Sequence, residues 1–291
     1  MFTVTLICNP NRTDLDITLI ENLRNAWGGG DAIWLNTGEA AEFPLPYLPE
    51  NQWTVWQDLQ GIGVDLVIQP TKGRKKQMLL ADMDSTMIQQ ECIDELAAEA
   101  GVGNHVADIT ARAMNGELDF DTALRERVGL LAGLDVNVID HVLATRITLM
   151  PGGPALLATM KANGANAALV SGGFTDFTSH IAQTLGFDQD RANTLIQKNG
   201  KLTGEVGTPI LGRDAKVQTL NEITQAHNLT PADVIAVGDG ANDLGMLQAA
   251  GTGVALHAKP VVQDQVQVRI NHGDLTALLY IQGYSMADFV T

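Results

Sequence analysis

Residues 78–86 read MLLADMDST: an apolar run at residues 78–81, predicted to be a strand, is followed by two aspartates one residue apart, Asp82 and Asp84. Short apolar runs of the same kind recur at residues 167–170, 234–237 and 254–256. Longer segments of helical period separate them, and that alternation predicts a parallel sheet with crossover helices. We therefore expect an α/β fold in which polar residues that follow the strands gather at one edge of the sheet.

An insertion is expected between the first two of these strands. Residues 88–150 are almost wholly helical in composition, with glycines at the expected helix ends. Because the insertion begins beside the end of the first strand, we predict that it forms a helical cap over the site. Farther along, the polar stretch NGKLTG at residues 199–204 predicts a hairpin turn.

The N-terminal part of the chain has a different composition. All four tryptophans precede residue 60, and a polar stretch at residues 69–77 follows. The pattern predicts strands at residues 3–8, 32–35 and 65–68. It predicts helices between them, at residues 17–27 and 53–59. We expect a small α+β domain over residues 1–75 and a second domain over residues 76–291, since 291 residues suggest about two domains.

The charge balance bears on possible partners. The sequence has 18 basic and 34 acidic side chains, a formal net charge of −16, and no basic stripe that could bind nucleic acid. Its one basic run, KGRKK at residues 72–76, is interpreted as a solvated linker rather than a binding patch. A small anion can still bind such a protein, but only through local cations or a metal ion.

The sequence also predicts where the protein acts. No apolar run approaches the roughly 20 residues of a membrane-spanning helix, and the first residues do not resemble a signal peptide. Cys8 and Cys92 are the only cysteines, too few for a disulfide framework. We therefore expect a cytoplasmic protein with no membrane partner.

Three polar clusters follow the predicted strands of the second domain: DMDST at residues 82–86, SGG at residues 171–173 and GDGAND at residues 238–243. Taken singly, the first could be an Asx turn or helix cap, and the second an ordinary turn. A serine hydroxyl beside glycine amides before a helix also suits a phosphate group. Two carboxylates in a glycine loop suit Mg²⁺, a hard cation that prefers oxygen ligands.

Together, DMDST, SGG, Lys216 and GDGAND resemble, in order, the four motifs of the haloacid dehalogenase (HAD) superfamily, over about residues 78–291. The resemblance implies a Rossmann-like parallel sheet, a Mg²⁺ cofactor and covalent phosphoryl transfer. It makes Asp82 the nucleophile and a metal ligand. It makes Asp84 the general acid and base, with its backbone carbonyl on the metal. Asp239 becomes the second metal-binding carboxylate, and Asp243 orients a metal-bound water.

The same resemblance assigns the substrate-binding groups. Ser171, the Gly172 amide, Lys216 and Asn242 are implied to hold the phosphoryl oxygens. The stretches DMDSTMIQQECIDELA, LDFDTALRERVGLL and VGDGANDLGML further resemble the phosphoserine phosphatase family. This narrower likeness implies that Glu91 binds the amino group and Arg127 the carboxylate of O-phosphoserine. Without it, these two would read as an ordinary surface ion pair.

The expected activity is hydrolysis of O-phosphoserine to serine and phosphate, the last step of serine biosynthesis. Two alternatives stay open: transfer of the phosphoryl group to an alcohol acceptor, and amino-acid sensing by the first domain. That domain loosely resembles an ACT-type module, although a packing or oligomerisation role fits equally well. The preference for L- or D-phosphoserine, feedback by serine and the oligomeric state, including a homodimer, also stay open.

Overall fold

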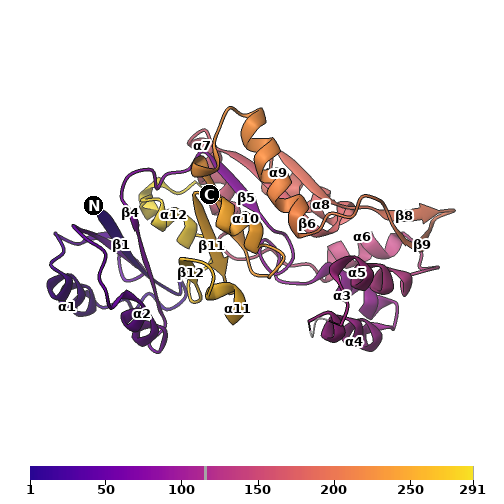
Figure 1. Cartoon of the computed structure of the whole chain (residues 1–291), viewed down its shortest axis with the longest axis horizontal. Coiled ribbons are helices and arrows are strands. Elements are labelled where there is room, and N and C mark those ends of the chain that lie inside the picture. The colour runs from indigo at the N-terminus through magenta and orange to yellow at the C-terminus, as the bar shows by residue number, and fades with distance from the viewer. Residues whose placement is uncertain (115–116, 291) are drawn as a thin grey trace. The chain divides into compact units, whose positions relative to one another are not determined.

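The computed structural model describes residues 1–114 and 117–290. The N-terminal segment, indigo to violet in Figure 1, contains β1 and β4. It forms an antiparallel sheet whose strand order is β2-β3-β1-β4. Its strands are β1 (Phe2–Cys8), β2 (Ile33–Asn36), β3 (Ala40–Leu45) and β4 (Val64–Pro70). Strand β1 pairs with both β3 and β4, so that Phe2 lies opposite Leu45 on one side and Pro70 on the other.

Two helices cover one face of this sheet, α1 (Ile17–Trp27) and α2 (Gln52–Gln60). Helix α1 buries Ile20, Leu23 and Trp27, whose spacing places them on one side of a helix. They pack against alternate residues of β1, including Val4 and Leu6, in one apolar core. Burial of this stripe drives the helix onto the sheet.

Helix α1 begins and ends where its sequence predicts. The Asp16 side chain accepts the backbone N–H of Thr18 at 2.8 Å, which satisfies a free donor of the first turn. Gly28 ends the helix at a φ of 65°, a conformation that favours glycine.

The second sheet has six strands in the order β12-β11-β10-β5-β6-β7. They are β5 (Met78–Ala81), β6 (Asn166–Phe174), β7 (Gln189–Asn193), β10 (Val234–Gly238), β11 (Thr252–Leu256) and β12 (Val268–Ile270). The sheet is parallel, as the registers of β10 with β11 and of β6 with β7 illustrate. The predicted α/β class with a parallel sheet is therefore confirmed.

The predicted helical insertion contains α3 (Cys92–Glu99), α4 (Gly103–Met114), α5 (Phe120–Gly129) and α6 (Asn137–Thr145). Its two ends meet, because Gln89 N–H donates to the Thr148 carbonyl and Met150 N–H to the Met87 carbonyl, both at 2.9 Å. The first and last residues of the insertion therefore lie side by side. Its role as a cap stays a prediction.

The remaining helices are α7 (Gly153–Ala162), α8 (Thr175–Leu185), α9 (Arg213–Ala226), α10 (Leu244–Ala249), α11 (Pro260–Gln263) and α12 (Ala277–Ile281). The predicted hairpin turn is confirmed. Strands β8 (Leu195–Lys198) and β9 (Lys201–Val206) pair across it, with Lys198 opposite Lys201. Asn199 and Gly200 adopt positive φ values of 52° and 75° in the turn, as a two-residue hairpin of this type requires.

The chain divides into two compact units. The first comprises residues 1–80, 151–167 and 220–291, and the second comprises residues 81–150 and 168–219. The boundary predicted near residue 75 stays a prediction. Within the described ranges, no helix combines the length and apolarity that crossing a bilayer requires.

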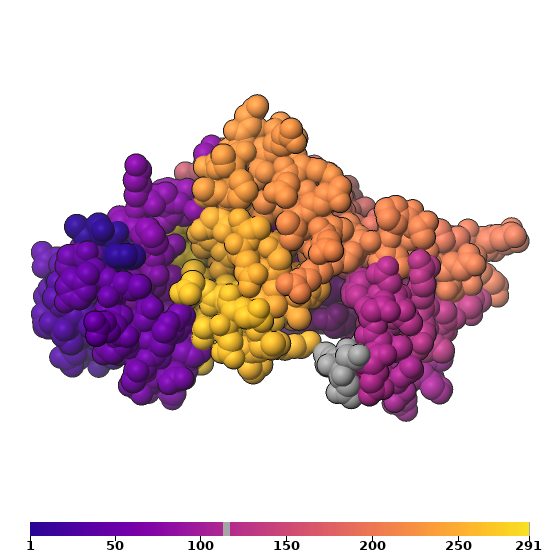
Figure 2. Space-filling view, in the orientation of Figure 1, coloured from indigo at the N-terminus to yellow at the C-terminus, as the bar shows by residue number. Residues whose placement is uncertain are grey.

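A buried carboxylate ties the N-terminal sheet to the C-terminal segment within the first unit. Asp65 of β4 accepts three backbone N–H groups, from Asn271 at 2.8 Å, His272 at 2.9 Å and Gly273 at 2.8 Å. The N-terminal atoms, indigo to violet, lie directly against the yellow C-terminal atoms in the space-filling view (Figure 2). Asp65 is fully buried, so these hydrogen bonds replace the water that its carboxylate loses.

Candidate active site

The second unit brings the first aspartate of DMDST against a lysine 134 residues away. Lys216, near the start of α9, donates from Nζ to Asp82 Oδ1 at 2.5 Å. The exposed fractions of the two side chains are 1% for Lys216 and 5% for Asp82. Either charge would be costly to bury alone, so each is stabilised by the other in this buried pair. An ionised carboxylate held beside a fixed cation can attack an electrophile that carries negative charge.

The second aspartate of DMDST has a different environment. Asp84 is half-buried, and its Oδ1 accepts the Cys92 backbone N–H at 3.2 Å. Burial raises the pKa of the Asp84 carboxyl to about 7, and the negative charge of Glu91 adds to the shift. The Cys92 hydrogen bond and the Lys216 charge oppose it. Near neutral pH this carboxyl can therefore both give and take a proton, which is what a general acid and base requires.

The SGG cluster lies inside β6, and this corrects our expectation that the strand ends at Val170. Between the pairs Val170–Arg191 and Phe174–Asn193, β6 advances four residues while β7 advances two. The extra residues bulge out of the ladder, which glycines allow because they carry no side chain. The Ser171 hydroxyl accepts the Gly173 N–H at 2.8 Å and so holds the bulge in shape.

Glycine is required at the second position of this bulge. A Cβ at Gly173 would lie 2.7 Å from Asp84 Oδ2 and 3.0 Å from Ser171 Oγ. The Ser171 hydroxyl and the Asp84 carboxyl therefore lie around the same small space. Sequence reasoning quoted Gly173 within the motif but assigned it no role.

Asn193, at the end of β7, is a residue that sequence reasoning missed. It is buried, and its Nδ2 donates to the Gly172 carbonyl at 2.9 Å and to the Leu211 carbonyl at 3.3 Å. Its Oδ1 accepts the Leu211 N–H at 2.7 Å. Asn193 therefore fixes the SGG bulge to the segment that leads into α9 and Lys216. No motif surrounds it in the sequence, so no local signal could have found it.

We expect Asn193→Ala to lower both stability and activity. The substitution leaves three partly buried backbone groups without their partner, which costs roughly 1–3 kcal/mol of unfolding free energy. It also frees the SGG bulge to shift, and a displacement of about 1 Å can reduce turnover on the order of a hundredfold. Urea unfolding and steady-state kinetics of the folded fraction measure the two effects.

Asn163→Ala, which removes a surface Asn bonded to the Thr159 carbonyl, is the matched control and should change neither stability nor activity by much. Unchanged activity in Asn193→Ala would contradict the positioning role.

The predicted substrate-binding pair lies on the insertion. Glu91 is the N-cap residue of α3, is exposed, and accepts the Ser85 hydroxyl at 2.7 Å. Arg127 lies half-buried in the last turn of α5 and donates from Nε to the Ala123 carbonyl at 3.3 Å. Burial lowers the pKa of the Arg127 guanidinium, and three carboxylates act in the opposite direction: Asp94, Glu91 and Asp84.

Arg127 interacts electrostatically with Asp84, one of the two aspartates of DMDST, as well as with Asp94 and Glu91. A cation among these carboxylates, near both Glu91 and Asp84, suits a substrate that carries opposite charges close to the scissile bond. Asp94 was not singled out from the sequence. Its position three residues after Glu91 on the same helix face is the signal that could have found it.

Phe120 forms an apolar wall beside the SGG bulge. A Cβ added at Gly172 would lie 3.2 Å from the Phe120 ring, and one added at Gly212 would lie 3.4 Å from it. The ring thus packs over both backbone segments that Asn193 joins. Side chains at either glycine would push it away.

The remaining predicted residues belong to the first unit, in the loop after β10. Asp243 is fully buried and its Oδ2 accepts the Gly240 N–H at 3.0 Å, which curls the loop back on itself. A Cβ at Gly238 would lie 2.5 Å from Asp243 Cγ, so glycine is required there. Asp239 and Asn242 are half-buried on this loop.

The sequence model of the haloacid dehalogenase-like hydrolase family matches residues 79–248, more than half of the chain. The chain belongs to this family, as its motifs predict. Phosphoserine phosphatases are among the relatives it resembles. The enzyme of Archaeoglobus fulgidus is 42% identical over 224 residues, which are 76% of this chain and 65% of that enzyme's length. The chain thus spans just under two thirds of that relative.

Two solved structures are informative. A HAD family hydrolase from Salmonella enterica serovar Typhi has a TM-score of 0.87 and 32% identity, covering 97% of this chain and 99% of its own, the N-terminal segment included. A phospho-aspartyl intermediate analogue of a phosphoserine phosphatase has a TM-score of 0.66 and 40% identity, covering 71% of this chain and 98% of its own.

Proposed function

We propose that the protein hydrolyses O-phosphoserine to serine and inorganic phosphate, the last step of serine biosynthesis, in the cytoplasm. The observation that carries the proposal is the pair of unlike carboxyls in DMDST. Asp82 accepts a hydrogen bond from the Lys216 ammonium at 2.5 Å, while burial and Glu91 raise the pKa of Asp84 to about 7. One carboxyl paired with a cation, beside a second whose pKa is raised, is the arrangement that nucleophilic catalysis with a general acid requires.

In the proposed reaction, an Asp82 oxygen attacks phosphorus and forms an aspartyl-phosphate as the seryl oxygen departs. Asp84 gives its proton to that oxygen, and it then takes a proton from the water that attacks the phosphoryl group. This attack breaks the bond between phosphorus and Asp82, which releases inorganic phosphate and restores the carboxylate. The Ser171 hydroxyl, the Gly172 N–H and the Lys216 ammonium, with Asn242, stabilise the charge that spreads over the phosphoryl oxygens. The phospho-aspartyl analogue of the similar phosphoserine phosphatase supports the covalent route.

We further propose Mg²⁺ as the cofactor. Within the part of the chain that the structure describes, Asp82, Asp239 and Asp243 are acidic residues that could hold a metal ion. All offer carboxylate oxygens, which suit a hard divalent cation, and the Asp84 carbonyl could add another. Asp82 and Asp239 follow β5 and β10, which are neighbours in the strand order. Since Asp243 already accepts the Gly240 N–H, it suits an orienting role better than direct coordination. When bound, the ion supplies positive charge that offsets repulsion between Asp82 and the phosphate.

Arg127 and Glu91 provide the proposed selectivity for an amino acid. Arg127→Ala is expected to raise KM for phosphoserine by about ten- to a hundredfold, the worth of one charge-assisted hydrogen bond of roughly 1.5–3 kcal/mol. Turnover of p-nitrophenyl phosphate, which lacks the carboxylate, should hardly change. Arg125→Ala, an exposed arginine two residues earlier on the same helix, is the matched control. Equal losses on both substrates would make Arg127 structural.

A phosphate-release screen tests the proposed function directly. The full chain is assayed with Mg²⁺ on L- and D-phosphoserine, phosphothreonine, a sugar phosphate and p-nitrophenyl phosphate. We expect the largest kcat/KM for a phosphoserine enantiomer. A larger value for a phosphate without an amino-acid moiety would overturn the substrate assignment. Product analysis with added glycerol separates hydrolysis from phosphoryl transfer, since only transfer yields glycerol phosphate.

A further inference from the structure

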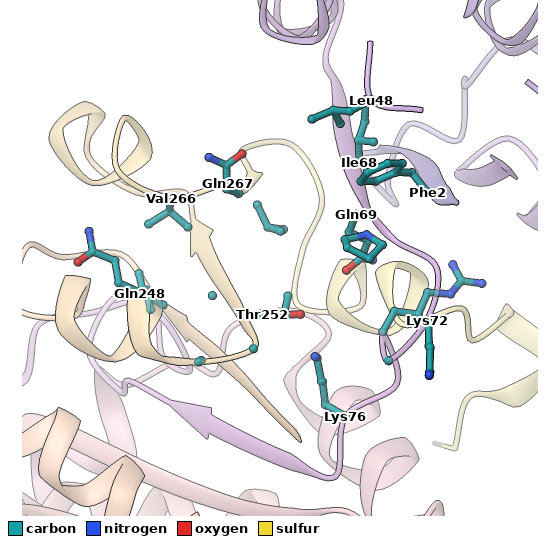
Figure 3. A pocket seen from close by; sticks show the side chains of 18 of the residues that line it. Phe2, Leu48, Ile68, Gln69, Lys72, Lys76, Gln248, Thr252, Val266 and Gln267 are labelled. Carbon is teal, nitrogen blue, oxygen red and sulfur yellow. The ribbon is translucent and has the colours of Figure 1, made fainter. Parts of the chain in front are cut away.

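A cavity of about 510 Å³ in the first unit contains none of the residues assigned to the reaction. One wall comes from the N-terminal sheet, with Phe2, Ile68 and Gln69. The other comes from the C-terminal part of the unit, with Thr252 at the start of β11 and Val266 just before β12 (Figure 3). Both walls belong to the same compact unit. The volume falls in the range of small-molecule sites in proteins.

The charges that line this cavity have one sign. Every charged residue among the lining side chains is basic, namely Lys72, Arg74 and Lys76. Arg74 is already matched by Glu42, to which it donates two hydrogen bonds, one of 2.8 Å. The positive charge at the cavity therefore comes from the two lysines, in a protein whose net charge is −16.

Lys76 is well suited to receive an anion. Its Nζ donates to the Ala232 carbonyl at 2.8 Å, a neutral partner. Burial lowers the pKa of the Lys76 ammonium, although Asp233 acts in the opposite direction. A partly desolvated cation interacts more strongly with an anion than a hydrated one does. In Figure 3 the Lys76 side chain lies between the two walls.

The rest of the lining is apolar or neutral. Phe2, Leu48, Ile68 and Val266 contribute apolar surface, and glutamine side chains such as Gln267 contribute amide groups. A fully hydrated inorganic ion would make no use of this surface. A ligand with an apolar body and one anionic end would use both features, because burying its body is favourable while its charge meets the lysines.

We propose that this cavity binds a small amphipathic anion, a molecule with a single acidic group on an aliphatic or aromatic body, with the acidic group beside Lys72 and Lys76. The basic run KGRKK then has a function beyond joining two segments. The proposal does not depend on the substrate of the active site.

The probe for the test is 8-anilinonaphthalene-1-sulfonate, an aromatic sulfonate whose fluorescence rises in apolar surroundings. We expect saturable binding with a stoichiometry near one to the folded protein. Lys72→Met should weaken binding about tenfold, and Lys72→Met with Lys76→Met more, because each removes a charge-assisted contact. N-phenyl-1-naphthylamine, the same aromatic body without the sulfonate, should bind the unaltered protein and both lysine variants equally. Gln267→Trp, which fills the cavity from an exposed position, should block both probes.

Two controls locate the bound probe. Lys198→Met removes an exposed lysine far along the chain, and Arg127→Ala removes the cation of the proposed active site. Neither should alter the affinity. Thermal unfolding of each variant establishes that it is folded. Lack of saturable binding, equal affinity in the lysine variants, or a loss confined to Arg127→Ala would overturn the proposal.

Discussion

The Asp82→Asn variant is expected to release no phosphate from phosphoserine above background, a loss of at least about 10⁴-fold by comparison with other nucleophile replacements. An amide oxygen is a poor nucleophile and cannot form the acyl phosphate that the carboxylate of Asp82 would form. The fold should survive with lower stability: the substitution removes the charge that faces Lys216, but the asparagine oxygen can still accept the Lys216 hydrogen bond that Asp82 accepts at 2.5 Å. Phosphate release and circular dichroism together measure the outcome.

The matched control is Asp108→Asn, the same substitution at an exposed position of α4. It should retain full activity. Rapid acid quench of the unaltered protein, followed by peptide mapping, should find the phosphoryl group on Asp82. Normal turnover in a folded Asp82→Asn variant, or label on another residue, would refute the covalent assignment.

The Asp84→Asn variant is expected to lose about 10²- to 10⁴-fold in turnover of phosphoserine, the usual contribution of a general acid. The seryl oxygen is a poor leaving group that needs the proton, whereas p-nitrophenolate leaves without one. We therefore expect Asp84→Asn to retain a burst of p-nitrophenolate, equal to one per active site, followed by slow turnover. Stopped-flow absorbance measures it. Loss of both the burst and the turnover would show that Asp84 does more than transfer protons.

The pH profile gives a second measurement of Asp84. The general acid must be protonated, so kcat/KM for phosphoserine should fall as pH rises through the Asp84 pKa of about 7. The negative charge of Glu91 contributes to raising that pKa, so Glu91→Gln should move this limb to lower pH. An unshifted limb in Glu91→Gln would show that another group controls it.

The sequence predicts the regular parts of the fold well, because local patterns determine them. Helix α1 and strand β5 match their predicted limits, Ile17–Trp27 and Met78–Ala81. Strand β3 was missed, since its sequence AAEFPL carries a glutamate and a proline. Its Glu42 is buried through pairing with Arg74, which only the tertiary structure reveals. Strand β12 has three residues, too few to show a period.

The candidate site, like the fold, has residues that the sequence predicts and residues that it does not. The resemblance to the HAD motifs points to Asp82, Asp84 and Lys216, to which we assign the proposed chemistry. Asn193 was not predictable, because its importance comes from two carbonyls and an N–H brought to it from distant segments. The bulge in β6 was also missed, since a glycine pair after an apolar strand normally marks the strand's end.

The three hydrogen bonds to Asp65 have a consequence for how the protein unfolds. If the N-terminal strands detached alone, a buried carboxylate and the amides of Asn271, His272 and Gly273 would lose their partners together. Partial opening at this place is therefore unfavourable, and β4 and residues 271–273 should form one cooperative unit. Their amide hydrogens are expected to exchange with solvent at a common rate, set by a single shared opening event.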